Sequence, residues 1–247
     1  MLFIANWKMH GGMDFIHHWA QNFTPPNTAQ VVVCPPFPYL SAVRAALPAT
    51  IAVGAQNIAR WAEDGAHTGE VSARMLAECG GSYGLVGHSE RRLLCGEDDQ
   101  QCADKIIAAA GAGLCPILCV GETQQQRDAG DTTAVIDRQL TALDGMAAED
   151  FAAKMAVAYE PVWAIGSGKT PSANEISDIR QYIQQKLIVK MGAFGSTITL
   201  LYGGSVTPDN IAMAIQAGMG GCLVGGASLR PDVFADICAC GAEAREN

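Results

Sequence analysis

The sequence predicts an α/β fold, a single (β/α)8 barrel in which eight parallel strands are each followed by a helix. Three observations predict it. Short apolar runs, most of them rich in β-branched residues, recur eight times along the 247 residues. The segments between them show helical spacing, and no linker or shift of composition divides the chain. Continuous rather than alternating hydrophobicity is typical of strands buried on both faces, as in parallel sheets. We therefore expect one domain over residues 1–247.

The predicted strands follow the apolar runs in chain order. They are Phe3–Lys8, Val31–Cys34, Ile51–Ala55, Tyr83–Gly87, Ile117–Gly121, Met155–Glu160, Thr197–Tyr202 and Cys222–Gly225. The alternative architecture is an open, doubly wound sheet. Eight near-equal units without a break favour the closed barrel over that alternative.

Helical spacing is clearest in two of the intervening segments. The apolar positions are Cys102, Ile106 and Ala109 in the first, and Ile176, Ile179, Ile183 and Leu187 in the second. Gly111 is expected to cap the end of the first helix. Thr170-Pro171 and Thr207-Pro208 each predict an N-cap followed by proline at the first helical position.

Composition limits the class of protein. The net charge of -9 argues against a nucleic-acid partner, which needs a basic face. No apolar run approaches the roughly 18 residues of a membrane span, and Met1–Lys8 does not resemble a secretory leader. The nine cysteines are an odd number without a CxxC pair, which favours reduced thiols. We expect a cytoplasmic protein without a membrane partner.

Polar residues gather where the predicted strands end, which is where the active site of such a barrel lies. In strand order they are Asn6 and Lys8, His88 and Glu90, Cys119 and Glu122, Glu160, Gly203-Gly204-Ser205, and Gly225-Gly226. The glycine-rich turns after the last two strands allow backbone N–H groups to approach an anion closely and predict a phosphate site. Lys8 in an apolar strand needs an anion beside it, either a structural carboxylate or a phosphorylated substrate.

His88 and Glu160 are candidates for acid–base chemistry. His88 stands where a short helix begins, and the positive potential of a helix N-terminus keeps an imidazole neutral. A neutral ring can still donate a hydrogen bond to a developing oxyanion. Glu160 ends an apolar run and is followed by a stiff Pro161-Val162-Trp163 and a pliable Gly166-Ser167-Gly168. This pattern is typical of a base attached to a hinged lid, although an ordinary surface loop has a similar composition.

Three short motifs could suggest a cofactor or metal, and none of them fits. Gly168-Lys169-Thr170 lacks the first glycine of a phosphate-binding loop, where Trp163 stands. His88-Ser89-Glu90 has no PCxxC partner for a zinc site. Gly111-Ala112-Gly113 precedes a strand, whereas a dinucleotide fingerprint follows one. We predict no organic cofactor and no metal.

Several segments together resemble the triosephosphate isomerase family, and they do so along nearly the whole chain. They are Asn6-Trp7-Lys8, Gly54-Ala55-Gln56-Asn57, Thr68-Gly69-Glu70, Gly87-His88-Ser89-Glu90-Arg91-Arg92, Cys119-Val120-Gly121-Glu122-Thr123, Ala158–Lys169, Tyr202-Gly203-Gly204-Ser205-Val206 and Val224-Gly225-Gly226-Ala227-Ser228-Leu229. The resemblance implies a TIM barrel that interconverts dihydroxyacetone phosphate and D-glyceraldehyde 3-phosphate through an enediolate, in glycolysis and gluconeogenesis.

The resemblance also implies roles for individual residues. Glu160 would be the base, neutral His88 would polarise the carbonyl, Lys8 and Asn6 would stabilise the enediolate, and Glu90 would support them through Lys8. The residues implied to bind substrate are Asn6, Lys8, Gly166, Ser205, Gly225 and Gly226. The implied lid comprises Pro161, Val162, Trp163, Ala164, Ile165, Gly166, Ser167, Gly168, Lys169 and Thr170, with hinges at 161–163 and 169–171.

A homodimer is implied as well. The stretch from Gln56 to Glu70 has little pattern of its own, and in this family it inserts into a second subunit through Thr68, Gly69 and Glu70. His67 departs from the aromatic residue often found before that threonine. Two other readings stay open, namely a phosphate-binding barrel that acts on a larger sugar or indole phosphate, and a barrel retained as a scaffold without catalysis.

Overall fold

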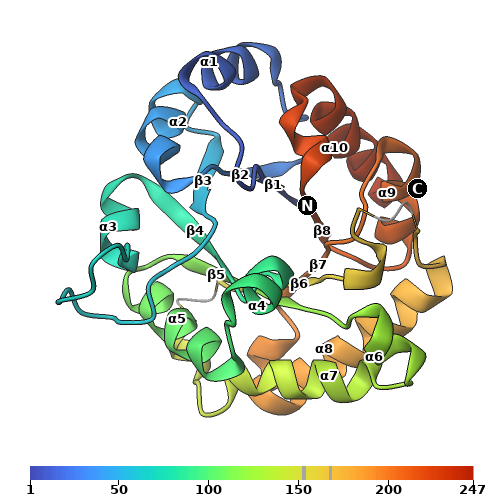
Figure 1. The fold of residues 1–247 in the computed structure, drawn as a ribbon. Helices are drawn as coiled ribbons and strands as arrows, with labels where there is room; N and C mark the ends of the chain where they lie inside the picture. Colours follow the sequence, from blue (N-terminus) through green and yellow to red (C-terminus); the bar gives the residue numbers. More distant parts are fainter. Residues whose placement is uncertain (152–153, 167–168, 247) are drawn as a thin grey trace.

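The protein is a closed barrel of eight parallel strands, ordered β1-β2-β3-β4-β5-β6-β7-β8, with β8 paired to β1. The computed structural model describes residues 1–151, 154–166 and 169–246. Figure 1 looks along the barrel and shows the helices as an outer ring around the strands. The predicted (β/α)8 barrel is confirmed, and the open doubly wound sheet is excluded.

The strands lie close to their predicted positions. They are β1 (Leu2–Asn6), β2 (Gln30–Cys34), β3 (Ile51–Ala55), β4 (Gly81–Val86), β5 (Cys115–Val120), β6 (Ala156–Tyr159), β7 (Thr199–Tyr202) and β8 (Gly221–Val224). Only β3 has the predicted bounds, and the others shift by a residue or two. The parallel register places all the strand ends at one pole of the barrel, so residues that follow the strands share one mouth.

The apolar residues of each strand divide between two cores. Alternate residues such as Ile4, Leu85 and Ile117 are buried with one another in one cluster. Their strand neighbours, such as Phe3 and Val86, belong to the larger cluster that includes the helices. Successive side chains of a strand point to opposite faces. Both faces are therefore covered, which explains the continuous apolar runs in the sequence.

Helices follow the strands around the outside. They are α1 (Met13–Asn22), α2 (Leu40–Ala46), α3 (Ala73–Glu78), α4 (Ser89–Cys95), α5 (Asp99–Gly111), α6 (Gln124–Asp128), α7 (Thr132–Gln139), α8 (Ala173–Gly195), α9 (Pro208–Gln216) and α10 (Pro231–Glu246). Short 3-10 turns include η4 (Val162–Ala164) and η5 (Gly226–Leu229). No helix within the described residues is long and apolar enough to cross a membrane.

Two predicted helix ends are wrong, and a third is confirmed. Gly111 is still helical, Ala112 is the C-cap of α5, and the left-handed turn follows at Gly113, with φ 75°. Helix α8 begins after Ser172 rather than Thr170. The Glu175 N–H donates to Ser172 Oγ, and the Ser172 N–H donates to the Glu175 carboxylate at 2.7 Å, so this reciprocal capping box fixes the start. Thr207-Pro208 opens α9 as predicted.

Candidate active site

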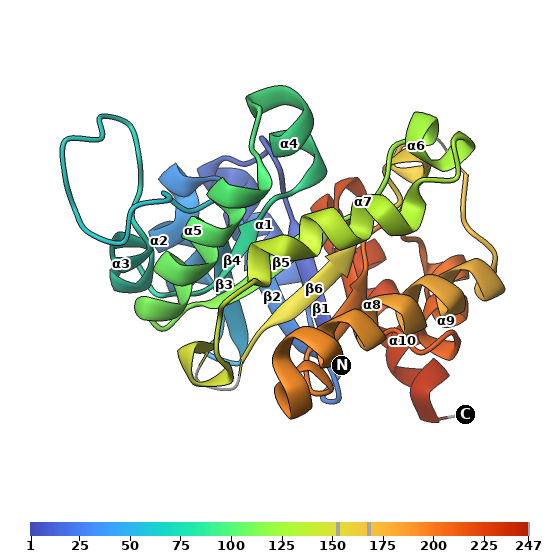
Figure 2. The same ribbon diagram turned by 90° about the horizontal axis from the view of Figure 1, so that it is seen from below.

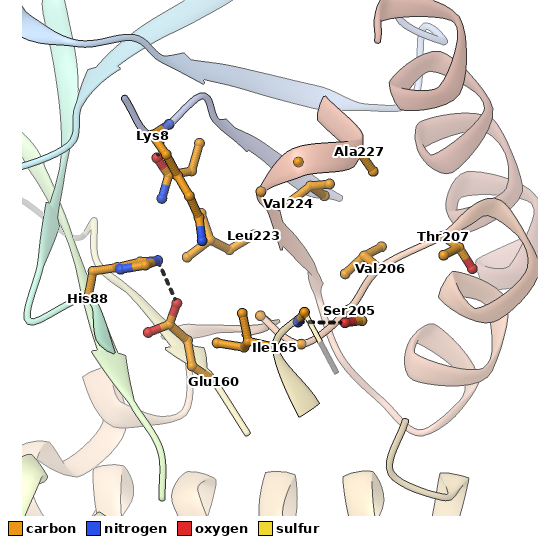
Figure 3. A pocket seen from close by; sticks show the side chains of 16 residues that line it. Lys8, His88, Glu160, Ile165, Ser205, Val206, Thr207, Leu223, Val224 and Ala227 are labelled. Carbon is orange, nitrogen blue, oxygen red and sulfur yellow. Dashed lines mark hydrogen bonds and ion pairs between the residues drawn. The ribbon is translucent and has the colours of Figure 1, made fainter. Parts of the chain in front are cut away.

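One pocket of about 320 Å³ lies at the mouth where the strands end. Its wall includes polar side chains of Asn6, Lys8, His88, Glu160 and Ser205. The glycine turns that follow β7 and β8 complete the wall. Figure 3 shows His88 and Glu160 on one side of the pocket and Ser205 on the opposite side, with the Lys8 side chain extending between them. The structure therefore brings together groups that the sequence places up to two hundred residues apart.

The central contact joins an imidazole to a carboxylate. His88 Nε2 lies 3.0 Å from Glu160 Oε1, and the two side chains are 7% and 2% exposed. His88 is also the N-cap of α4, and its Nδ1 accepts the Glu90 N–H at 3.2 Å. A ring nitrogen that accepts a hydrogen bond carries no proton, so these contacts are those of a neutral ring with its proton on Nε2.

Two influences on the pKa of His88 oppose each other. Burial lowers the pKa, but the charge and hydrogen bond of Glu160 outweigh burial and raise it above the ordinary value. The Glu90 N–H at Nδ1 favours the neutral form, as expected for a ring at a helix N-terminus. Neutral His88 thus remains a prediction, and the Glu160 carboxylate is the main group that works against it.

Besides His88, two backbone groups hold Glu160 in place. Its Oε2 accepts the Ser89 N–H at 2.9 Å, and its own N–H donates to the Val120 carbonyl at 2.7 Å. Burial raises the pKa of Glu160, but His88 and the Ser89 N–H together bring it below its ordinary value. A Cβ at Gly203 would lie 2.9 Å from Glu160 Cγ, so glycine at that position makes room for the carboxylate arm. The buried group is therefore ionised despite its surroundings.

Lys8 lies outside the strand, contrary to the sequence prediction. Strand β1 ends at Asn6, and Lys8 follows in a turn with φ 50°, the one positive φ among the described non-glycine residues. Its side chain is 27% exposed, so the expected burial in an apolar strand is wrong as well. The Lys8 N–H donates to Asn6 Oδ1 at 3.0 Å, and its carbonyl accepts from Gln56, and these bonds hold the unusual conformation. Backbone strain of this kind is concentrated at functional sites.

The anion beside Lys8 in this structure is Glu90. Lys8 Nζ lies 2.6 Å from Glu90 Oε1, and the Glu90 side chain is 47% exposed. The same carboxylate lies 3.8 Å from His88 Nδ1. Glu90 thus contacts both Lys8 and His88, and its role as a positioning residue stays a prediction.

The predicted phosphate-binding groups line the far wall. Gly225 adjoins the Lys8 side chain, since a Cβ there would lie 3.1 Å from Lys8 Cε. Gly226 begins η5 and lines the pocket beside Gly225. The Ser205 hydroxyl donates to the Ala164 carbonyl at 2.7 Å and accepts the Gly166 N–H at 3.3 Å. Gly166 and Ser205 therefore lie next to each other on the same side of the pocket, and Figure 3 shows Ser205 there, opposite His88.

The described part of the predicted lid comprises residues 161–166 and 169–170, and Ser167 and Gly168 lie outside the described residues. The chain after Glu160 forms η4 and is anchored to Glu122. Glu122 accepts Trp163 Nε1–H at 2.9 Å, and its carbonyl accepts the Val162 N–H at 3.0 Å. The first predicted hinge is thus attached to the barrel.

Glu122 itself does not line the pocket. It is fully buried behind the lid base, where it accepts the Tyr159 hydroxyl at 3.1 Å and lies 3.6 Å from Arg127. Cys119, also at the end of β5, is buried in the barrel interior.

Two contributors were missed by sequence reasoning, namely the Ser89 N–H on Glu160 and the Arg127 guanidinium, 4.2 Å above the Trp163 ring. The helix start at Ser89 was the available signal for the first of them.

Thr68, Gly69 and Glu70 do not reach this pocket. They are exposed in the segment between β3 and α3, which projects away from the barrel in both ribbon views (Figure 2). Within this segment the His67 ring stacks on Trp61 with centroids 3.7 Å apart. His67 thus makes an aromatic contact within its own segment, and what replaces the family's aromatic residue at a subunit contact stays untested. Within the described residues, no group of three or more His, Cys, Asp or Glu side chains is placed to hold a metal ion.

Comparisons with known proteins agree with this geometry. The family model described as triosephosphate isomerase matches residues 1–241. A triosephosphate isomerase of Alcanivorax borkumensis is 48% identical over 240 residues, which is 96% of each chain. One of Halorhodospira halophila is 44% identical over 243 residues, 97% of each chain. A match of this extent, on a closed barrel with these residues at its mouth, means that the chain belongs to the triosephosphate isomerase family.

Proposed function

We propose that this protein interconverts dihydroxyacetone phosphate and D-glyceraldehyde 3-phosphate, a reaction of glycolysis and gluconeogenesis. The observation that carries the proposal is the placement of the buried Glu160 carboxyl group against His88 Nε2, with Lys8 in the same pocket. The family and the names of the relatives support it. The reaction moves one proton between adjacent carbons and one between their oxygens, so it needs a base, a proton carrier and a cation, and no oxidant.

Glu160 removes a proton from C1 of dihydroxyacetone phosphate, and the electron pair passes to the carbonyl oxygen at C2. The result is an enediolate, whose charge is stabilised by Lys8 and by Asn6. His88 donates its Nε2 proton to one oxygen and takes a proton from the other. Glu160 then returns its proton to C2, which gives the aldehyde. Substrate must first displace the His88–Glu160 contact, because Nε2 can donate to only one acceptor at a time.

The phosphate group binds on the opposite wall. Ser205, Gly225 and Gly226 supply donors there, and Gly166 adds its N–H from the lid. In the structure that N–H is directed to Ser205 Oγ, so binding replaces one acceptor with another. Residues 161–170 act as the lid, which excludes water from the enediolate and opens to release product. The attachment of Trp163 to Glu122 supports a stiff hinge at the start of that segment.

The chain acts as a homodimer in this proposal. The projecting segment with Thr68, Gly69 and Glu70 supports it. A long loop without helix or strand that leaves a compact domain buries little surface in its own chain, and such loops are usually functional. Large apolar side chains are also exposed on neighbouring elements: Met9, Met13, Met75, Leu93 and Leu94. Surfaces of this kind mark interaction sites. A cytoplasmic location is proposed as well, and nine free thiols fit a reducing compartment.

A coupled assay tests the proposal directly. Purified protein receives dihydroxyacetone phosphate, and a dehydrogenase specific for glyceraldehyde 3-phosphate reports product through reduced nicotinamide. The expected result is rapid, saturable turnover that 2-phosphoglycolate inhibits. A barrel that acts on a larger sugar phosphate, or a scaffold, gives no isomerisation above buffer, and that outcome would overturn the proposal.

A further inference from the structure

A second pocket lies at the opposite pole of the barrel from the active site. It measures about 330 Å³ and is formed where strands begin rather than where they end. Its wall contains Leu2, Thr199 and Leu200 from the starts of β1 and β7, the Gly218–Gly220 turn before β8, and side chains of α8 and α10. In Figure 2 the N-terminus and the described end of α10 lie near this pole, away from α4 and α6.

The charge of this pocket is unlike that of the whole chain. Two arginines, Arg180 of α8 and Arg245 of α10, line it, and none of its described lining residues is acidic. Neither guanidinium forms an ion pair within the part of the chain that the structure describes. A protein with net charge -9 has many carboxylates to offer, so two unpaired arginines at one cavity form a local cationic site.

Arg180 carries the most specific observation. Its Nε–H is buried and has no hydrogen-bond partner within the described residues. The Gly218 turn packs against the guanidinium, since a Cβ at Gly218 would lie 3.3 Å from Arg180 Nε. Gly218 has φ 95°, a conformation that favours glycine, so the turn can approach this closely. A buried guanidinium N–H without an acceptor is unfavourable, and an oxyanion bound at this guanidinium would supply the acceptor once the Gly218 turn moves aside.

We propose that this pocket binds a small phosphate monoester. The guanidinium of Arg180 presents a planar set of donors that matches phosphate oxygens in pairs, and Arg245 adds a second cation at the rim. The volume is at the lower end of the range for ligand pockets, which suits a molecule of a few carbon atoms rather than a nucleotide. This site is separate from the pocket of His88 and Glu160, with which it shares no lining residue.

Nuclear magnetic resonance of the arginine Nε–H groups tests the proposal on the full-length protein. Glycerol 2-phosphate and inorganic phosphate are titrated separately, with sodium chloride at matched ionic strength as the reference. The expected result is a saturable shift of the Arg180 Nε–H signal and of the Gly218 and Gly220 amides with both phosphates, and no such shift with chloride. The readout is local, so it does not depend on what the active site binds.

Three variants make the experiment decisive. Arg180→Lys keeps the charge but removes the Nε–H and the planar donor pair, and should weaken binding at the Gly218 amide at least tenfold. Arg245→Gln, at an exposed position, should weaken it several-fold and serves if the first variant does not fold. Arg138→Lys, on α7 and 60% exposed, is the matched control and should change nothing. Shifts that do not saturate, that chloride reproduces, or that survive both pocket variants would overturn the proposal.

Discussion

His88 Nε2 and Glu160 Oε1 lie 3.0 Å apart, and this buried contact gives each residue a pKa shift in the direction that the other favours. These shifts favour a protonated His88 beside an ionised Glu160 in the unliganded protein, whereas the proposed reaction uses a neutral His88 ring. The contact that holds the Glu160 carboxylate in place therefore also raises the pKa of His88.

Replacement of Glu160 by Gln should abolish proton abstraction and preserve binding. The amide keeps the shape of the side chain and can still contact Ser89 and His88, but it cannot accept a carbon-bound proton. We expect kcat to fall by about 10³-fold or more, in the upper range of general-base effects. Calorimetry should show that 2-phosphoglycolate still binds. The control is Asp236→Asn, an exposed carboxylate on α10. Near-normal kcat in Glu160→Gln would remove Glu160 from the proposed role.

The same variant should lower the pKa of His88. In the wild type, the Glu160 carboxylate is the main group that raises that pKa against the effect of burial. Once Glu160 is uncharged, burial and the Glu90 N–H at Nδ1 both favour the neutral ring. A titration of His88 by ¹⁵N nuclear magnetic resonance should place its pKa below that of the wild type. An unchanged or higher value would mean that Glu160 does not control the ring.

Protein stability should follow the same pair. A pKa raised above 6.5 for His88 gives stabilisation that is complete below pH 6.5 and is lost as pH rises through the folded-state value. A pKa lowered below 4.5 for Glu160 gives stabilisation that is complete above pH 4.5 and is lost as pH falls through the folded-state value. The wild type should therefore exceed Glu160→Gln in free energy of unfolding most clearly between about pH 4.5 and 6.5. Urea titrations at fixed protein concentration at pH 5.5 and 8.5 check this, and a larger difference at pH 8.5 would contradict it.

Glu90 should act as a positioning residue through Lys8. The ion pair at 2.6 Å fixes the ammonium at the pocket edge, and Glu90→Gln would leave Lys8 free to adopt other rotamers. We expect kcat to fall by roughly tenfold or more, because small misplacements of a catalytic cation are costly, with a smaller change in KM. Glu90→Asp should recover part of the loss. A purely structural role for Glu90 would instead lower stability and leave kcat of the folded fraction intact.

Tyr159 should stabilise the base of the lid through Glu122. The Tyr159 hydroxyl donates to a carboxylate that is fully buried. Tyr159→Phe removes one donor from that charge, so the free energy of unfolding should fall by about 1.5–3 kcal/mol, the range for hydrogen bonds to charged groups. Tyr39→Phe is the control, on a tyrosine of the second βα segment. Denaturant unfolding measures both variants, and equal effects would contradict the proposed anchoring.

Strands that are buried on both faces appear in the sequence as continuous apolar runs, and such runs can be recognised without tertiary information. The fold was therefore predictable. Local chemistry predicted the wrong conformation at Thr170 and at Lys8. Thr170 and Ser172 are both N-cap residue types, and the Glu175 side chain decides between them through its capping box with Ser172. The turn at Lys8 depends on Asn6 and on Gln56, which comes from a different loop. The Ser89 contact with Glu160 spans 71 positions, and no local pattern encodes such a contact.

The proposed dimer should depend on exposed apolar side chains at the subunit contact. Leu94 on α4 is 81% exposed, and Val189 on α8 is 82% exposed, so the two form a matched pair. Leu94→Asp should introduce a charge that a subunit contact would bury, whereas Val189→Asp should leave the charge in solvent. Analytical ultracentrifugation should find the wild type and Val189→Asp at twice the chain mass and Leu94→Asp shifted toward the monomer. Activity per chain should fall with the dimer fraction if the projecting segment completes the partner's site. A wild-type protein that sediments as a monomer at micromolar concentration would contradict the dimer, and equal behaviour of the two variants would place the interface elsewhere.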